Sequence, residues 1–406
     1  MVTLDKMLSL AKGSRFDSTG PEKNSAPDLE KIYALGDATK HDICVSSASS
    51  RKVTGLDRIG DVAKGGICHS FSHDGRCVSM FKTLFTNECK HQCAYCSNST
   101  TCKKHHAKFS YEPHELANLF MKLYLGNYVE GLFLSSGIGD DEHRTMEQMI
   151  ESTRILRERH KFAGYVHLKI LPGADKEHIA QAVELADRVS VNIEVPDAGY
   201  MDVLSPTKDY DLDILRRQRY IKGLEKRRGL PAGQTTQFVI GGASESDREV
   251  FDSVLKEYDD MKLKRVYYSS FLPVEGTALE ENAAQPTWRE HRLYQIDWLY
   301  RVYKLEDREI SLAFNENDNL PNTDPKVTIA RETMDSPIDP NLASYGELLR
   351  VPGIGPISAR RIISTRRSGR IRTRKELHYL GVRTKRAAPF IKLGGWQDSL
   401  LERWIN

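Results

Sequence analysis

Between residues 78 and 303, short apolar runs alternate with longer stretches of mixed apolar and polar residues. The short runs predict buried strands, and the longer stretches predict helices. The predicted strands are Val78–Phe85, Gly131–Ser135, Tyr165–Leu171, Val189–Val195, Thr235–Ile240 and Val266–Phe271. The predicted helices are Pro113–Tyr128, His143–Arg159, Lys176–Ala186, Leu212–Arg228, Asp247–Leu263 and Thr287–Tyr303.

Strands that alternate with helices predict an α/β fold with a parallel sheet and right-handed crossovers. The chain contains six such strand–helix units. Parallel sheets place their chemistry at the carboxyl ends of the strands. We therefore expect the functional residues to lie where the predicted strands end.

Changes in composition divide the rest of the chain. Residues 1–27 are polar and predict a flexible N-terminus, and residues 28–77 form an N-terminal extension with one helix, Asp28–Leu35. The strand–helix domain covers residues 78–314. Asn, Asp and Pro dominate residues 315–340, which predict a linker. A small domain at residues 341–393 and a tail at residues 394–406 complete the prediction.

The overall composition is that of an ordinary globular protein. Of the 406 residues, 39% are hydrophobic and 28% are charged. No apolar run is long enough to cross a bilayer, and Met1–Gly20 lacks the apolar core of a signal peptide. We therefore expect a cytoplasmic protein without a membrane partner. Seven cysteines, three of them clustered, suit a reducing compartment and metal binding.

The net charge of +3 conceals an asymmetry. Residues 350–392 contain 13 Lys or Arg residues and one acid, Glu376, so this block has a net charge of +12 and the remainder of the chain −9. A compact basic block beside an acidic body predicts a module that binds a polyanion.

Three cysteines, Cys89, Cys93 and Cys96, follow the first predicted strand with the spacing Cys-x3-Cys-x2-Cys. A disulfide framework fits poorly because no fourth cysteine completes a local pair, and a closed zinc site usually requires four ligands. Three thiolates on a tight loop could instead hold three irons of a cuboidal iron–sulfur cluster and leave the fourth iron open. His91, between the cysteines, is interpreted as a loop side chain.

This spacing, with Tyr95 before the last cysteine, resembles the signature of the radical S-adenosylmethionine (SAM) superfamily. The resemblance implies a partial (β/α)6, TIM-like barrel and a 4Fe–4S cluster held by Cys89, Cys93 and Cys96. It also implies that the cluster binds SAM and cleaves it reductively, giving a 5′-deoxyadenosyl radical that abstracts hydrogen from a substrate. An electron donor such as flavodoxin or ferredoxin is then required.

The resemblance assigns SAM contacts to other strand ends. Ser135-Ser136-Gly137 occupies the place of a Gly-Gly-Glu-like turn whose backbone receives the SAM amino group, but this turn has no acid. Ile240-Gly241 resembles a motif of the fifth strand that packs on adenine, and the backbone of Tyr95 is expected near adenine. Ordinary strand-to-helix turns are the alternative reading of both Gly-containing segments.

Asn192 and Glu194 share one face of their predicted strand because side chains alternate along a strand. They could bind the ribose or the methionine part of SAM, or support neighbouring loops. Lys169 could pair with the SAM carboxylate, or lie solvated at the rim.

Four further cysteines, Cys44, Cys68, Cys77 and Cys102, would suffice for a second iron–sulfur cluster or a zinc ion, with His69 as another possible ligand. Their spacing is long and irregular. Free cysteines are the alternative interpretation.

The basic block contains a Val-Pro-Gly-Ile-Gly-Pro turn between two helical stretches, which resembles a helix-hairpin-helix. In such a motif, backbone N–H groups at a tight glycine turn donate hydrogen bonds to a nucleic-acid phosphate at a helix N-terminus. Residues 377–386 could form a degenerate second copy. A helical hairpin that contacts protein is the alternative. The candidate DNA-binding residues are Gly353, Ile354, Gly355, Ser358, Arg360, Arg361, Arg366 and Arg367.

From about residue 28 onward, the order of these parts resembles a family of DNA modification or repair radical SAM proteins. That resemblance implies duplex DNA as the partner and a functional link to a uracil-DNA-glycosylase-like protein. The leading hypothesis is therefore a radical enzyme that repairs or modifies a nucleotide in DNA. Two alternatives stay open: a radical enzyme that modifies structured RNA, and a non-catalytic nucleic-acid-binding iron–sulfur protein.

Overall fold

The computed structural model describes residues 29–39, 67–71, 77–104, 107–139, 141–393 and 396–397. The chain divides into two compact units. The first contains the residues up to Glu245 together with Asp252–Gln285, and the second contains Ser246–Phe251 and the residues from Pro286 onward. Within the described residues, no helix combines the length and apolar character that a bilayer crossing requires.

The first unit is built on a seven-stranded sheet whose strands are neighbours in chain order. Strand β1 pairs antiparallel with β2, and β2 to β7 are all parallel. The strands are β1 (Ile67–Phe71), β2 (Cys77–Leu84), β3 (Gly131–Ser135), β4 (Tyr165–Lys169), β5 (Arg188–Ser190), β6 (Gly233–Ile240) and β7 (Arg265–Ser270). Six parallel strands in sequential order confirm the predicted partial barrel.

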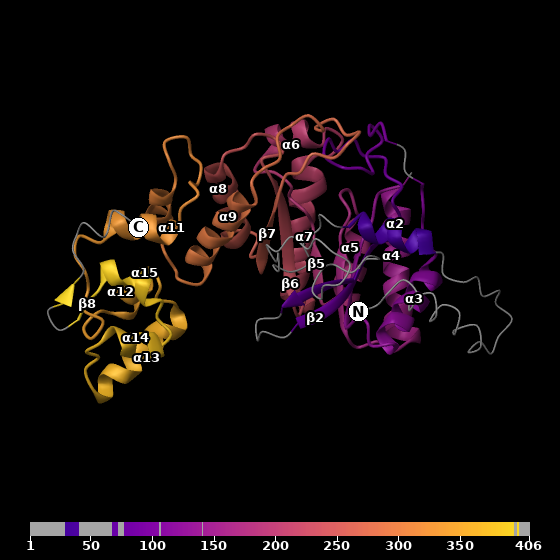
Figure 1. Cartoon of the computed structure of the whole chain (residues 1–406). Helices are drawn as coiled ribbons and strands as arrows, with labels where there is room; N and C mark the ends of the chain where they lie inside the picture. The colour runs from indigo at the N-terminus through magenta and orange to yellow at the C-terminus, as the bar shows by residue number, and fades with distance from the viewer. Residues whose placement is uncertain are drawn as a thin grey trace. The chain divides into compact units, whose positions relative to one another are not determined.

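Helices of the first unit run beside these strands, and α3, α4, α5 and α7 are successive neighbours (Figure 1). The helices are α2 (Leu29–Asp37), α3 (Pro113–Leu125), α4 (Glu142–Arg154), α5 (Lys176–Leu185), α6 (Ala198–Leu204), α7 (Arg216–Arg228) and α8 (Asp247–Asp259), whose first residues belong to the second unit. Single π-helical turns, Ile155–Arg159 and Tyr210–Leu215, extend α4 and precede α7. Leu132, Leu134, Val166 and Leu168 are completely buried, as expected for the strand face that packs on helices.

Strand β5 ends earlier than the apolar pattern predicts. The prediction was Val189–Val195, whereas the ladder stops at Ser190. Beyond it, Glu194 has a left-handed backbone with φ of 65°, which interrupts the strand, although its N–H still donates to the Gln237 carbonyl. Helix α6 was not predicted. Its start is marked by Asp197, whose carboxylate accepts hydrogen bonds from the Gly199 and Tyr200 N–H groups.

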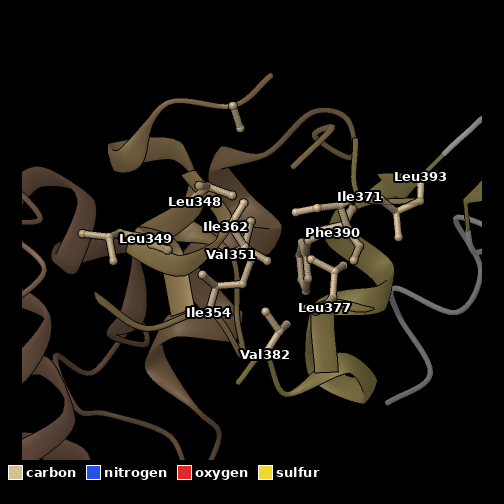
Figure 2. Close-up of a cluster of buried hydrophobic side chains, with 14 of the residues drawn as sticks. Leu348, Leu349, Val351, Ile354, Ile362, Ile371, Leu377, Val382, Phe390 and Leu393 are labelled. Atoms are coloured by element: carbon tan, nitrogen blue, oxygen red, sulfur yellow. The ribbon is translucent and has the colours of Figure 1, made fainter. Parts of the chain in front are cut away.

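The second unit is largely helical. Its elements are α9 (Thr287–Arg301), α10 (Asp307–Ile310), a 3₁₀ turn (Ser311–Ala313), α11 (Pro325–Thr333), α12 (Tyr345–Arg350), α13 (Pro356–Ser368), α14 (Arg374–Tyr379), α15 (Thr384–Ala387), a second 3₁₀ turn (Ala388–Phe390), and the short strands β8 (Lys392–Leu393) and β9 (Trp396–Gln397). Figure 2 shows Leu348, Val351 and Ile362 grouped with Leu377 and Phe390 in its hydrophobic core. All five are at most 2% exposed.

The domain boundaries of the structure differ from those expected from composition. The strand–helix domain was expected to reach residue 314, but residues from Pro286 onward cluster with the second unit. The expected linker, residues 315–340, contains helix α11. Asp324 caps this helix by accepting the Lys326 N–H, and Pro325 is its first residue, so an Asp-Pro pair starts a helix within a loop-like composition.

Candidate cluster site and candidate nucleic-acid interface

The cysteine loop begins directly after β2, at the carboxyl end of the first parallel strand. Cys93 is 7% exposed, and Cys89 and Cys96 are partly buried. Backbone hydrogen bonds hold the middle of the loop in place: the Ala94 N–H donates to the Leu204 carbonyl, and the Ala94 carbonyl accepts from the Leu279 N–H, at 2.8 and 3.2 Å. The loop that bears the thiols is therefore anchored to segments far away in the sequence.

Gly137 allows the cysteine loop to approach the end of β3 closely. A Cβ atom at this position would lie 2.3 Å from the Glu88 carbonyl oxygen. The Gly137 N–H donates to the Thr86 carbonyl at 2.7 Å, and the Lys90 N–H donates to the Ile138 carbonyl at 2.6 Å. The Ser136 hydroxyl accepts the Thr86 N–H at 3.3 Å. The Ser135–Gly137 turn thus positions the cysteine loop, and its predicted contact with SAM stays a prediction.

A segment that sequence reasoning missed, Ser205–Lys208 after α6, lies against the cysteines. The Ser205 hydroxyl is 3.1 Å from the Cys93 sulfur. The Thr207 hydroxyl lies 3.0 Å from Nδ1 of His91 and accepts the Gln92 N–H at 3.1 Å. Burial, with a smaller effect of Lys208 and Lys90, lowers the pKa of His91 to about 4, so the imidazole is neutral. A Ser-Pro-Thr-Lys run carries no distinctive spacing, so only the fold could identify it.

Lys208 places a buried positive charge among the thiols. Its side chain is 7% exposed, and its Nζ lies 3.5 Å from a carboxylate oxygen of Glu194, which is 5% exposed. Burial by itself lowers the pKa of Lys208, but Cys93, Glu194, Cys89 and Cys96 together raise it above the usual value. The predicted site residue Glu194 is therefore linked to the cysteines by its ion pair with Lys208. Its left-handed backbone is a local strain that the surrounding structure must support.

The donor set fits a metal cluster. Burial and the neighbouring thiol of Cys93 raise the pKa of Cys96 to about 12, so the protein alone does not favour three free thiolates here. A bound metal would remove that penalty, because thiolates are the form that ligates. The ammonium of Lys208 would offset part of the negative charge that three thiolates bring. Cys89, Cys93 and Cys96 are thus suited to hold an iron–sulfur cluster.

The end of β6 is organised by an acid that the sequence did not single out. Glu245 is 2% exposed and accepts hydrogen bonds from the N–H groups of Gly241 and Ala243. Gly241 has φ of 77°, and Ile240 is completely buried. The Gly-containing turn is therefore a rigid loop at a strand end, and its expected contact with adenine stays a prediction.

The remaining expected SAM contacts, Tyr95, Lys169 and Asn192, are partly buried. Of the four cysteines proposed for a second metal, Cys44 lies outside the described residues, and only backbone pairing is described for Cys68 and Cys77. Cys102 is 8% exposed, and its thiol lies 3.6 Å from the Lys104 carbonyl oxygen. The second metal stays a prediction.

Three further possible metal ligands lie together near the starts of α4 and α5. The ligand atoms of His143, Asp175 and His178 are within 4.8 Å of one another. Each imidazole Nδ1 lies 3.2 Å from one carboxylate oxygen of Asp175. Asp175 also caps α5 by accepting the His178 N–H, which accounts for the position of the carboxylate.

Two helical hairpins in the second unit pack turn against turn. Residues 351–355 join α12 to α13, and residues 380–383 join α14 to α15. Gly353 and Gly381 have φ of 85° and 88°. A Cβ on Gly353 would lie 2.6 Å from the Arg383 carbonyl oxygen, and one on Gly381 would lie 3.1 Å from the Ser358 hydroxyl. The segment expected to be a degenerate second copy is thus a second hairpin. Because each glycine lacks a Cβ atom, the two hairpins can pack closely at their turns.

The candidate DNA-binding side chains are not equivalent. Arg360, Arg361 and Arg367 are exposed on α13. Arg366 donates to the Pro340 and Ala343 carbonyls, at 3.0 and 2.6 Å, and so also stabilises its own domain. Ser358 is 6% exposed and belongs to the contact between the hairpins.

Lys326 is a buried residue that hydrogen-bonds to the turn of the first hairpin. Its Nζ donates to the Ile354 carbonyl at 2.6 Å and lies 4.4 Å from the centre of the Tyr303 ring. Lys326 is 8% exposed, and burial lowers its pKa to about 7. A charged form of this lysine is therefore costly near neutral pH.

Two segments of the chain match known families. Residues 83–255 match the radical SAM superfamily, and residues 335–381 match the helix-hairpin-helix motif. Residues 83–255 are a radical SAM domain. The radical SAM domain contains the three cysteines and the ends of β3 to β6, and this class of enzyme implies a 4Fe–4S cluster and SAM as cofactors. No curated protein sequence matches the chain significantly.

Solved structures with a partly similar fold include three proteins. Methylornithine synthase is 17% identical with a TM-score of 0.45, covering 54% of this chain and 61% of its own. The FeFe-hydrogenase maturase HydG from Carboxydothermus hydrogenoformans is 10% identical with a TM-score of 0.42, covering 53% and 49%. The radical SAM methyltransferase TsrM from Kitasatospora setae is 12% identical with a TM-score of 0.38, covering 49% and 38%. The chain thus spans less than two thirds of each of these proteins.

Replacing Lys208 by Met should destabilise the radical SAM domain by about 3–5 kcal/mol, because the buried Glu194 carboxylate loses its partner. Adding Glu194→Gln should recover part of the loss, since an amide needs no counter-charge. Urea unfolding of the metal-free protein measures both effects. Lys226→Met, at an exposed position of α7, is the control. Additive destabilisation by the two changes would contradict the pairing.

The stability of the second unit should depend on pH through Lys326. The unfolded lysine titrates near its usual pKa of 10.5 and the folded one near 7, so the unfolded chain binds more protons between these values. The free energy of unfolding therefore rises with pH in this window, by at most about 1.4 kcal/mol per pH unit. Calorimetry at pH 7 and at higher pH should show the rise in the wild type and lose it in Lys326→Met. An equal slope in both proteins would exclude Lys326 as its source.

Proposed function

We propose that the protein is a radical SAM enzyme that acts on a nucleotide of duplex DNA. The observation that carries this proposal is the presence, in one chain, of a radical SAM domain with three clustered cysteines and a paired helical hairpin with exposed arginines. The radical SAM domain would supply the radical chemistry, and the paired hairpins would bind the polyanion.

In this proposal Cys89, Cys93 and Cys96 hold a 4Fe–4S cluster. The cluster, when bound, supplies the electron and the open iron site for reductive cleavage of SAM. The residues of the chain do the rest. Gly137 lets the cysteine loop lie close to the end of β3, and the Ser205 hydroxyl contacts Cys93. Lys208 keeps a positive charge beside the thiols.

SAM would extend from the cysteine loop over the neighbouring strand ends. The proposed contacts are Tyr95, the turn Ser135–Gly137, Lys169, Asn192, Glu194 and the turn at Ile240-Gly241. These groups lie at or just beyond the last residues of β2 to β6, whose carboxyl ends meet at one edge of a parallel sheet. The carboxylate of Glu194 is already paired with Lys208, so it would act through that pair.

The hairpin pair would hold the DNA by its backbone. Gly353, Ile354 and Gly355 lie immediately before the first residue of α13, where backbone N–H groups of a helix start favour an anion. Arg360, Arg361 and Arg367 on the same helix add charge. Contacts of this kind position a duplex without reading its sequence. The target nucleotide would have to leave the base stack to reach a barrel.

Two partners belong to the proposal. A reduced donor such as flavodoxin or ferredoxin would deliver the electron. A uracil-DNA-glycosylase-like protein is the functional partner that the family resemblance favours, and it would act on the same class of substrate.

Changing Cys93 to Ala should abolish SAM cleavage while DNA binding survives, because the thiol and the hairpins belong to different units. The measurement is 5′-deoxyadenosine formed by the anaerobically reconstituted protein with dithionite, SAM and duplex DNA. Cys102→Ala is the matched control and should retain about four irons per chain and activity, provided one cluster is present. Wild-type protein that forms no 5′-deoxyadenosine would leave a non-catalytic iron–sulfur protein as the better description.

Changing Arg360 and Arg361 to Gln should weaken binding of duplex DNA regardless of its sequence. Each lost phosphate contact should also reduce the slope of log K against log salt by about 0.9. Fluorescence anisotropy at several salt concentrations measures both, with Arg227→Gln in the first unit as the control. Tighter binding of a structured RNA than of duplex DNA at equal salt would favour the RNA-modifying alternative.

A further inference from the structure

Two histidines and an aspartate meet at the carboxyl edge of the sheet. Strands β3 and β4 are parallel neighbours, so α4, which follows β3, and α5, which follows β4, begin at the same edge and pack side by side. His143 lies in the first turn of α4, Asp175 is the N-cap of α5, and His178 lies in the first turn of α5. One possible ligand atom from each of these residues lies within 4.8 Å of the other two.

The carboxylate of Asp175 joins the two imidazoles. Its Oδ1 lies 3.2 Å from Nδ1 of His178, and its Oδ2 lies 3.2 Å from Nδ1 of His143. The ligand atoms of a tetrahedral zinc ion with bonds of about 2.0–2.1 Å lie about 3.3 Å apart. The His143 side chain is 50% exposed, so solvent surrounds half of the group that would move to bring all three residues onto one ion.

An unsatisfied atom distinguishes this cluster from an ordinary ion pair. Nδ1 of His178 is buried and makes no hydrogen bond, although Oδ1 of Asp175 lies 3.2 Å away. If this nitrogen carries a proton, it is a buried donor without an acceptor. If it does not, its lone pair faces a carboxylate oxygen. Both states cost free energy, and a cation bound by the two atoms would remove the cost of the second.

The position at two helix starts favours the form of histidine that binds metals. The positive end of a helix dipole disfavours a protonated imidazole in the first turn. Neutral imidazole is the ligating form. The same dipoles would oppose a metal ion, but acids at the starts of α4 and α5 offset them. These acids are Asp141, Glu142, Asp175 and Glu177.

The lysines closest to this cluster in the fold and in the sequence have other partners. Lys90, in the cysteine loop, pairs with Glu142. Lys176, next to Asp175, has its Nζ 5.7 Å from the centre of the Tyr220 ring on α7. Burial raises the pKa of Asp175, but the backbone N–H groups at the start of α5 and the neighbouring imidazoles bring it below its usual value. The carboxylate is therefore ionised at neutral pH, as a metal ligand must be.

We propose that His143, Asp175 and His178 bind one divalent transition-metal ion, of which zinc is the representative. Two imidazoles and one carboxylate are a donor set that suits zinc, whereas Mg²⁺ prefers oxygen ligands alone. Three protein ligands leave a fourth position, and the exposure of His143 and Asp175, 50% and 37%, opens it to solvent. The inference does not rest on the proposed function, and it uses none of the cysteines.

The ion would join the starts of two helices beside the cysteine loop. Glu142, which pairs with Lys90 of that loop, directly precedes His143. Because the ligands come from α4 and α5, the ion would bind the folded domain and not the unfolded chain. Zinc should therefore raise the melting temperature of the protein.

The test uses the full-length, untagged protein with its iron–sulfur cluster reconstituted under anaerobic conditions. Equilibrium dialysis against zinc should leave about one zinc ion per chain in this site, and excess Mg²⁺ should not displace it. X-ray absorption at the zinc edge should show nitrogen and oxygen ligands at about 2.0–2.1 Å, whereas zinc on cysteines shows sulfur at about 2.3 Å. This readout separates the site from zinc on the cysteines, so a failure of the iron–sulfur cluster to form is recognised as a different result.

Two variants remove ligands while keeping the helix starts intact. His143→Gln changes a half-exposed side chain, and Asp175→Asn removes the charge but retains a good N-cap for α5. Each should weaken zinc binding by at least about tenfold, since even the loss of an outer-shell partner has that effect. His114→Gln is the matched control, because His114 is an exposed residue at the second position of α3, as His143 is in α4. The control should bind zinc as the wild type does.

Wild-type protein that takes up no zinc, or takes it up with sulfur ligands alone, would overturn the inference without any variant having to fold. Zinc contents of His143→Gln and Asp175→Asn equal to that of the wild type would also overturn it. A rise in melting temperature that persists in both variants would assign the ion to another place. In each of these cases the three side chains would form an ion-pair cluster only.

Discussion

The candidate site depends on one close backbone contact, in which Gly137 lies against the carbonyl of Glu88. Any side chain at residue 137 would displace the loop that carries Cys89, Cys93 and Cys96. Hydrogen bonds on both sides of this contact join the loop to the end of β3, and others join it to the segments at Leu204 and Leu279. Three thiols from a loop are therefore held by the rigid edge of a sheet, which is the condition for presenting a cluster in one orientation.

The carboxyl edge of the sheet also contains buried charges close to the cysteine thiols. Lys208 and Glu194 form a buried pair beside the thiols, while the sheet itself carries cations and no acids. Because burial makes an unpaired charge costly, Lys208 and Glu194 can stay buried only as a pair. In the second unit, Arg360, Arg361 and Arg367 are exposed on α13, where solvent reduces the cost of their charge.

The paired hairpins depend on two glycines, one in each turn, and both are needed for the turns to pack together. Gly353 and Gly381 each adopt a left-handed backbone and each lie against the other hairpin. One hairpin alone would lack the buried partner that keeps its turn in shape, and the core in Figure 2 draws residues from both. Packing, and not only local turn chemistry, therefore maintains the surface proposed to bind DNA.

By itself the sequence determined the parallel α/β fold, the cysteine loop and the first hairpin, because apolar alternation, a short cysteine spacing and a glycine turn are all local signals. Strand ends, the unit boundary at Pro286 and helix α11 departed from expectation, since caps and strained residues such as Glu194 act against composition. Only the tertiary structure brought Ser205, Thr207 and Lys208 to the cysteines and placed His143 beside Asp175. These residues are distant along the chain, and it is strand register and loop packing that make them neighbours.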